Sequence, residues 1–129
     1  GSAHGWEVAL EWIDSAQPLI AVTGWATLGS LVSIKPDSQL DLAALDGLLQ
    51  RVAQTIHQES DLVRYQMNSF VIAVGSYVQP LTETAIQTAE QIGQVMADLG
   101  NMYRTWRGWP PSTVPISVFP KPFVHRRMV

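Results

Sequence analysis

The stretch DLVRYQMNSFVIAVGSYVQP, residues 61–80, decides whether the centre of the chain is a strand or a helix. Its run FVIAVGSYV is rich in β-branched residues and would suit a buried strand. Apolar residues nevertheless return at helical intervals of 4, 3, 4 and 3, at Val63, Met67, Phe70, Val74 and Tyr77. Ser60 is a suitable N-cap residue, so the pattern predicts an eighteen-residue helix over 61–78 that is apolar on nearly every side.

The spacing of apolar residues predicts four more helices around this one, over residues 5–14, 18–34, 42–59 and 80–99. Pro18 suits a first helical turn, Asp41 is a candidate N-cap, and Gly100 is the expected residue that ends the last helix. Helices of this length joined by short turns suggest an antiparallel helical-repeat stack. No repeat is visible in the letters themselves, so periodicity alone predicts only an all-α fold.

The composition suits one globular domain of 129 residues, 47% of them hydrophobic. No segment approaches the roughly 20 consecutive apolar residues of a membrane span, so we expect a soluble protein without a membrane partner. The absence of cysteine excludes disulfides and thiolate metal sites and agrees with a cytoplasmic location. No phosphate-binding loop, metal-ligand cluster or nucleophile elbow is visible, and no cofactor is therefore expected.

Charge divides the chain into two parts. Residues 1–100 contain all eleven acidic residues and three of the eight basic ones, whereas residues 101–129 contain the other five. We expect a helical domain over 1–100, whose first five residues, GSAHG, resemble a cloning remnant, and an irregular, proline-rich, basic and aromatic tail over 101–129. Because affinity for DNA comes largely from phosphate neutralisation, an acidic body argues against strong DNA binding by the body alone.

Several segments resemble the C-terminal region of the DNA alkylation repair family, the AlkD-like proteins built from HEAT-like helical repeats. They are IH at 56–57, VRYQMNSFVIAVGSYVQPL at 63–81, A..IGQV.ADLGN at 89–101 and TGWATLGSL at 23–31. The resemblance covers roughly residues 6–101. It implies a HEAT-like stack of about five helices, followed here by the irregular tail.

The sequence also departs from the family's pattern. The family's Gly-x-Thr-x-Cys-Lys-Val-Pro run and the short helix after it are absent, and the proline-rich tail stands there from Met102. Family members extend further at the N-terminal side, so the chain looks like a C-terminal portion of such a protein. In glycosylase members the resemblance implies a basic concave face that binds the DNA backbone and a cluster of aromatic and carboxylate residues near the lesion. The carboxylate stabilises the cationic sugar as the damaged base leaves. This cluster cannot be matched residue by residue to positions of this sequence, so whether the chain is an enzyme stays open.

Arg64 and Asn68 are the sharpest candidates for a functional contact, because one helical turn separates them and both project from one face. They would contact a DNA phosphate or base edge, or else form a buried polar pair that caps a neighbouring helix or loop. Asp61 would hold Arg64 in a surface ion pair. Tyr65 would stack on a base or fill a groove between helices.

The tail offers a second candidate site, where Arg104 and Arg107 alternate with the aromatic residues Tyr103, Trp106 and Trp109. Proteins that bind single strands combine cations and aromatics in this way. The alternative is a tail that folds over the open end of the helical stack and buries its tryptophan rings.

Two other groups of residues favour a structural interpretation. His57 and Asp61 have the spacing of a metal pair or acid–base dyad, but no third ligand follows, which favours a solvated helix end. Trp6, Trp12 and Trp25 occupy apolar helical positions and are expected to pack in the core or an interface.

Two functions follow from these observations. The first is a DNA-repair-related HEAT-like scaffold with at most weak DNA binding. The second is a non-catalytic helical module that binds protein or its own copy, because a stack that ends at an apolar face needs that face covered. We therefore expect a homo-oligomer formed through the helices near the N-terminus.

Overall fold

The computed structural model describes residues 3–98 and 113–115. These residues form five α-helices: α1 (Ala3–Trp12), α2 (Pro18–Ile34), α3 (Leu42–Thr55), α4 (Asp61–Tyr77) and α5 (Thr82–Ile92). Short 3₁₀ turns, η1 (Asp37–Gln39), η2 (Ile56–Gln58) and η3 (Gln79–Leu81), lie between them. Strands β1 (Met96–Asp98) and β2 (Thr113–Pro115) pair antiparallel, with Met96 opposite Pro115. The predicted all-α class is confirmed, with this small strand pair as an addition.

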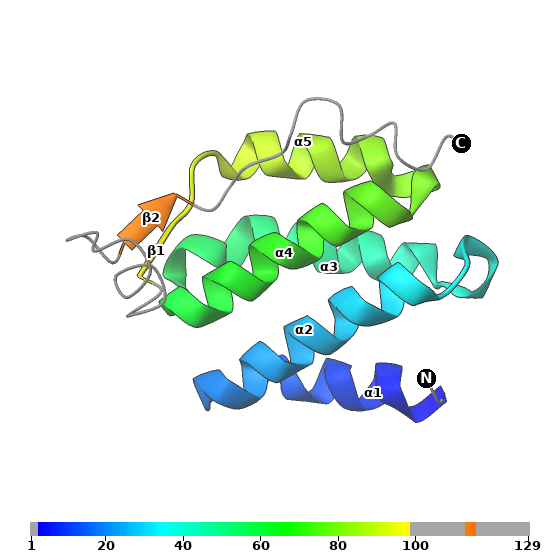
Figure 1. The fold of residues 1–129 in the computed structure, drawn as a ribbon, viewed down its shortest axis with the longest axis horizontal. Helices are drawn as coiled ribbons and strands as arrows, with labels where there is room; N and C mark the ends of the chain where they lie inside the picture. Colours follow the sequence, from blue (N-terminus) through cyan, green and yellow to red (C-terminus); the bar gives the residue numbers. More distant parts are fainter. Residues whose placement is uncertain (1–2, 99–112, 116–129) are drawn as a thin grey trace, which may run out of the picture.

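The helices α1, α2, α4 and α5 lie one beside the next, with α3 behind α4 (Figure 1). Helices α2 and α4 pack side by side, α1 packs against α2, and α5 packs against α4. Helix α3 lies behind α4 and contacts both α4 and α5. Strand β1 also contacts α4, so α4 has neighbours on several sides.

The central stretch is a helix, as its spacing predicts. Val63, Met67, Phe70 and Val74 are almost fully buried in α4, because the helix lies between α2 and α5. Ser60 stands at the N-cap without a side-chain hydrogen bond to the helix. The predicted cap of α3 is confirmed by a hydrogen bond that the Ala44 N–H donates to Asp41 Oδ1 over 3.1 Å.

Helix α5 is shorter than the spacing predicts, and this prediction was wrong. The expected helix over 80–99 begins only at Thr82 and ends at Ile92. Gly93 adopts a φ of 74° and its N–H bonds the Ala89 carbonyl, a conformation that stops a helix and that glycine tolerates best. The chain then continues into β1, while Gly100 lies outside the described residues.

Smaller differences affect two other helices. Helix α1 begins and ends two residues earlier than expected, and α3 ends at Thr55 rather than at residue 59, because the chain tightens there into the 3₁₀ turn η2. The bounds of α2 agree with the prediction. Within residues 3–98 and 113–115, no helix has both the length and the apolar character that crossing a membrane requires.

Arg51 of α3 joins elements that are distant in the sequence. Its Nη2 donates a hydrogen bond to the Ile13 carbonyl over 3.1 Å, and its Nη1 lies 2.7 Å from Asp14 Oδ1. The guanidinium also stands 5.9 Å from the ring centre of Trp25, which makes a T-shaped contact with Phe70 at 5.4 Å. One side chain thereby connects α3 to the end of α1 and to α2.

Candidate nucleic-acid interface

Helix α4 presents different side chains on its two flanks. Gln66, Ser69 and Phe70 face α2 and line a groove between the two helices. Arg64 precedes Gln66 by two residues, which is about 200° of helical rotation, and it therefore points to the other flank. Asn68 lies one turn further along that same flank. The two polar candidates share a side of α4, as predicted, but this side is turned away from the groove.

Arg64 is engaged within the protein. Its Nη1 donates a hydrogen bond to the Glu59 carbonyl over 2.7 Å, and its Nη2 bonds and pairs with Asp61 Oδ1. Glu59 is the C-cap residue that follows η2, so the guanidinium caps that turn, and the Arg64 side chain is only 22% exposed. These contacts match the capping alternative from the sequence, and a DNA contact by Arg64 stays a prediction.

Asn68 and Tyr65 differ in how far a ligand can reach them. Asn68 is 7% exposed, so nucleic acid would reach it only if this flank of α4 opened. Tyr65 is 36% exposed and lies on the solvent side of α4, four residues before Ser69 at the groove. Of these two predicted contacts, Tyr65 is the one that a nucleic acid can reach in the observed conformation.

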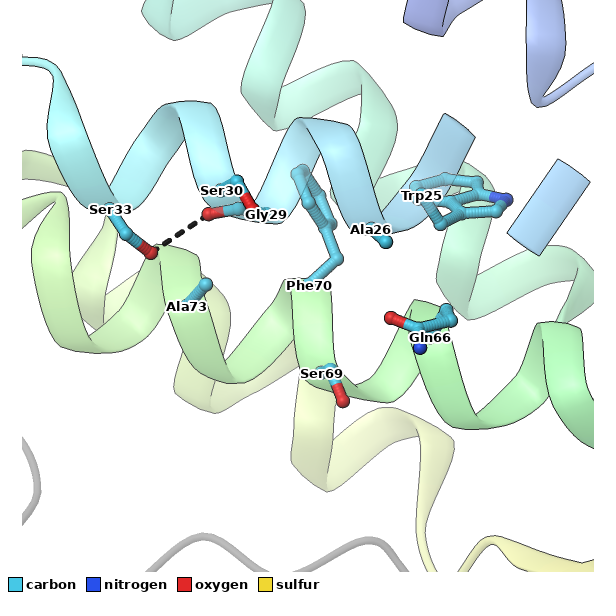
Figure 2. A pocket seen from close by; sticks show the side chains of 9 residues that line it. All are labelled: Trp25, Ala26, Gly29, Ser30, Ser33, Gln66, Ser69, Phe70 and Ala73. Carbon is cyan, nitrogen blue, oxygen red and sulfur yellow. Dashed lines mark hydrogen bonds between the residues drawn. The ribbon is translucent and has the colours of Figure 1, made fainter. Parts of the chain in front are cut away.

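The groove between α2 and α4 encloses about 300 Å³ and was not predicted from the sequence (Figure 2). Trp25 and Phe70 line it together with small and polar side chains from both helices, which are Ala26, Gly29, Ser30, Ser33, Gln66, Ser69 and Ala73. We call this surface the α2–α4 groove. The Ser33 hydroxyl donates a hydrogen bond to the Gly29 carbonyl over 2.8 Å. The small residues Gly29, Ser30 and Ser33, which follow one another on α2, are the feature of the sequence that indicates this groove.

Uncharged hydroxyl and amide groups of this kind contact phosphates and sugars in protein–DNA complexes and fix the position of the protein. They do not supply the charge neutralisation that dominates DNA affinity. Within residues 3–98 and 113–115 the only lysine and arginine residues are Lys35, Arg51 and Arg64, and both arginines bind internal carbonyl and carboxylate groups. The described part of the chain therefore has a polar groove without a basic patch around it.

The remaining candidates are structural or lie outside the described residues. Trp25 is 1% exposed and Trp6 packs partly buried against the core, whereas Trp12 is 39% exposed at the end of α1.

His57 is exposed and its Nε2 lies 2.9 Å from the Ile92 carbonyl. No cluster of potential metal ligands occurs in the part of the chain that the structure describes. Arg104 and Arg107 lie outside that part.

Comparison with solved structures connects this architecture to a known fold. The chain superposes with a TM-score of 0.71 and 28% identity on a protein described as one of "a new family of proteins related to the HEAT-like repeat DNA glycosylases with affinity for branched DNA structures". The match covers 74% of this chain and 41% of the solved one. The chain has a HEAT-like helical-repeat fold. The sequence prediction of this fold is thus confirmed.

Two curated proteins are similar in sequence, and both are uncharacterised. Lin0241 of Listeria innocua is 35% identical over 92 residues, and Lmo0209 of Listeria monocytogenes is 33% identical over 93 residues. The matches cover 71% and 72% of this chain but only 38% of each relative. The HEAT-like chain therefore spans well under half the length of these proteins. No family model matches it.

Proposed function

We propose that this HEAT-like chain is a DNA-binding scaffold related to DNA alkylation repair proteins, with weak affinity of its own. The observation that carries the proposal is its likeness to a solved glycosylase-related protein with affinity for branched DNA. The sequence segments that resemble the C-terminal region of the alkylation repair family support the same ancestry. A cytoplasmic location and a division into a domain (1–100) and a tail (101–129) belong to this proposal.

In this proposal, the sugar–phosphate backbone lies across the α2–α4 groove. Hydroxyl and amide groups of the groove position it, and Tyr65 stacks beside it. Arg104 and Arg107 of the tail supply the positive charge that the described helices lack there. Arg64 and Asn68 contact DNA only if their flank of α4 separates from the residues packed against it. In the observed structure Arg64 is hydrogen-bonded to the Glu59 carbonyl and Asn68 is buried.

The test is fluorescence anisotropy with a labelled four-way junction, beside a duplex and a single strand of the same composition, between roughly 50 and 200 mM salt. We expect the junction to bind most tightly and affinity to fall steeply with salt. Changing both Arg104 and Arg107 to Gln removes two phosphate contacts and should flatten the log–log salt slope by about 2. An unchanged slope would mean that the tail does not bind phosphate.

A matched pair of variants tests the groove itself. Gln66→Glu places a negative charge in the α2–α4 groove, whereas Gln87→Glu places the same charge at an exposed position of α5. If the backbone crosses the groove, the first variant binds the junction several-fold more weakly while the second stays close to the unchanged protein. Equal effects would show that only net charge matters and that DNA lies elsewhere.

Catalysis is tested separately, with a base-release assay on alkylated duplex DNA. Release of the base would establish that a catalytic cluster exists in spite of the missing sequence match. The absence of both base release and junction binding at low salt would reject the DNA function for this chain, though not its ancestry.

A second candidate function is a non-catalytic interaction module that binds protein or a second copy. The observation that favours it is the exposure of large apolar side chains on α1 and α2, among them Leu19 at 70% and Ile34 at 72%. A further groove of about 400 Å³ runs along α2, and it is lined by Val22, Thr23, Ala26, Thr27, Ser30, Leu31 and Ile34. We call it the α2 outer groove and propose it as the surface for self-association.

A further inference from the structure

A separate apolar groove lies where α1 ends and α2 begins. It encloses about 320 Å³ and is lined by Trp12, Leu19, Ile20 and Thr23. We call it the α1–α2 groove. Leu19 is 70% exposed and Trp12 39%, so no described residue covers these side chains fully. Two large apolar side chains that share an exposed concave surface are typical of a docking site.

The two helices that form this groove, with their connection, carry charge of one sign. From residue 3 to the end of α2 the chain contains Glu7, Glu11 and Asp14 but no lysine or arginine. Asp14 is paired with Arg51, whereas Glu7 and Glu11 are exposed on α1. An occupant of this groove should therefore combine apolar side chains with positive charge.

The last fourteen residues, 116–129, have that composition. The segment ISVFPKPFVHRRMV contains Phe119 and Phe123 together with Lys121, Arg126 and Arg127, and it contains no acidic residue. It is thus complementary to the α1–α2 groove in both polarity and charge.

The segment also starts close enough to reach the groove. Strand β2 ends at Pro115 and is paired with β1, which contacts α4. Figure 1 shows β1, β2 and the connection between α1 and α2 at the same end of the molecule. Adjacent packed helices lie about 8–10 Å apart, and the eight residues from Pro115 to Phe123 extend up to about 26 Å. Phe123 can therefore cross from β1 over α4 to α2.

We propose that residues 116–129 dock on the α1–α2 groove of the same chain. Phe123 packs against Leu19 and Trp12, and Arg126 and Arg127 lie near Glu11. Docking within one chain is favoured over docking between chains because the short connection holds the segment at a high local concentration. Thr23 is the one lining residue that the two grooves share, so the segment would leave most of the α2 outer groove uncovered. This inference goes beyond the proposed functions and does not depend on them.

The absence of cysteine from the chain permits a direct test by disulfide trapping. The pair Thr23→Cys with Val124→Cys places one thiol at the groove and one beside Phe123. The control pair, Gln87→Cys with Val124→Cys, places the first thiol at an exposed position of α5. Under mild oxidation we expect an intramolecular disulfide at least about tenfold faster in the first pair, measured by intact mass and non-reducing electrophoresis.

Two further substitutions, each added to the pair Thr23→Cys with Val124→Cys (the groove pair), separate specific docking from chance encounter. Leu19→Ser should slow the disulfide several-fold, while Leu62→Ser, which changes an exposed leucine on α4, should leave its rate unchanged. Equal rates in the groove and control pairs would overturn the proposal. A covalent dimer in place of an intramolecular bond would also overturn it and would identify a second copy as the occupant.

Discussion

At the scale of single residues, Arg51 shows how one side chain can hold distant parts of the chain together. Its ion pair with Asp14 is exposed to solvent, with 37% and 66% of the two side chains accessible. Exposed pairs of this kind contribute little because water and salt screen them. The bond to the Ile13 carbonyl is different, since it satisfies a carbonyl just after α1 and is partly buried. We infer that the carbonyl contact, together with the ring of Trp25, is the stabilising part of the cluster.

Two variants of the cluster test this inference. Arg51→Met removes the hydrogen bond, the ion pair and the cation above Trp25, and should lower the free energy of unfolding by about 1–3 kcal/mol. Asp14→Asn removes only the ion pair and should cost less than about 1 kcal/mol. Urea denaturation followed by circular dichroism measures both. Comparable losses in the two variants would show that the ion pair carries the stabilisation.

At the scale of secondary-structure elements, the contact between α1 and α2 depends on a glycine. A Cβ atom at Gly24 would lie 2.9 Å from both Cγ2 and the backbone nitrogen of Ile13, and 3.0 Å from the Ala9 carbonyl. Two of these three neighbours are backbone atoms, which cannot move without moving α1. Gly24 therefore sets the distance at which the first two helices pack.

Gly24→Ala should reduce the free energy of unfolding by about 1–3 kcal/mol, because the added methyl group forces α1 away from α2. The matched change Gly47→Ala lies in α3, where nothing stands within 4 Å of the new Cβ. It should stabilise the protein by about 0.5–1 kcal/mol through higher helix propensity. A neutral Gly24→Ala, measured in the same denaturation experiment, would mean that the close approach is not required.

At the scale of the whole molecule, one side of α2 is left uncovered by the other residues that the structure describes, 3–98 and 113–115. This helix is apolar around most of its circumference, and Ala21, Trp25, Leu28 and Val32 bury one half of it. The other half presents the α2 outer groove, with Ile34 72% exposed at its end. Helical-repeat proteins normally cover such a side with a neighbouring repeat or a partner.

Self-association through this side makes a prediction that sedimentation velocity can check. The protein should form dimers or larger species as its concentration rises, and Ile34→Glu should shift the distribution toward monomer by placing a charge in the apolar contact. Leu62→Glu makes the same kind of change on α4 and should have a smaller effect. A monomeric mass for the unchanged protein at high concentration would contradict self-association.

The candidate site was only partly predictable from the sequence. Helical spacing correctly placed Arg64 and Asn68 on one flank of α4, since that depends on local geometry alone. It did not reveal that this flank faces the protein, nor that Gln66 and Ser69 line one groove together with Ser30 and Ser33. Those relations join residues that are more than thirty positions apart, and only the packing of α2 against α4 creates them.

The sequence by itself determined the all-α class, the bounds of α2 and the helical state of residues 61–77, because apolar spacing and cap residues act within a few positions along the chain. Resemblance of its letters to a family also indicated the HEAT-like stack that the structural comparison confirms. The tertiary structure decided where α5 gives way to β1, which flank of α4 meets solvent, and where grooves form. These features depend on contacts between separate helices, and the free energy of such contacts is not encoded in any one segment.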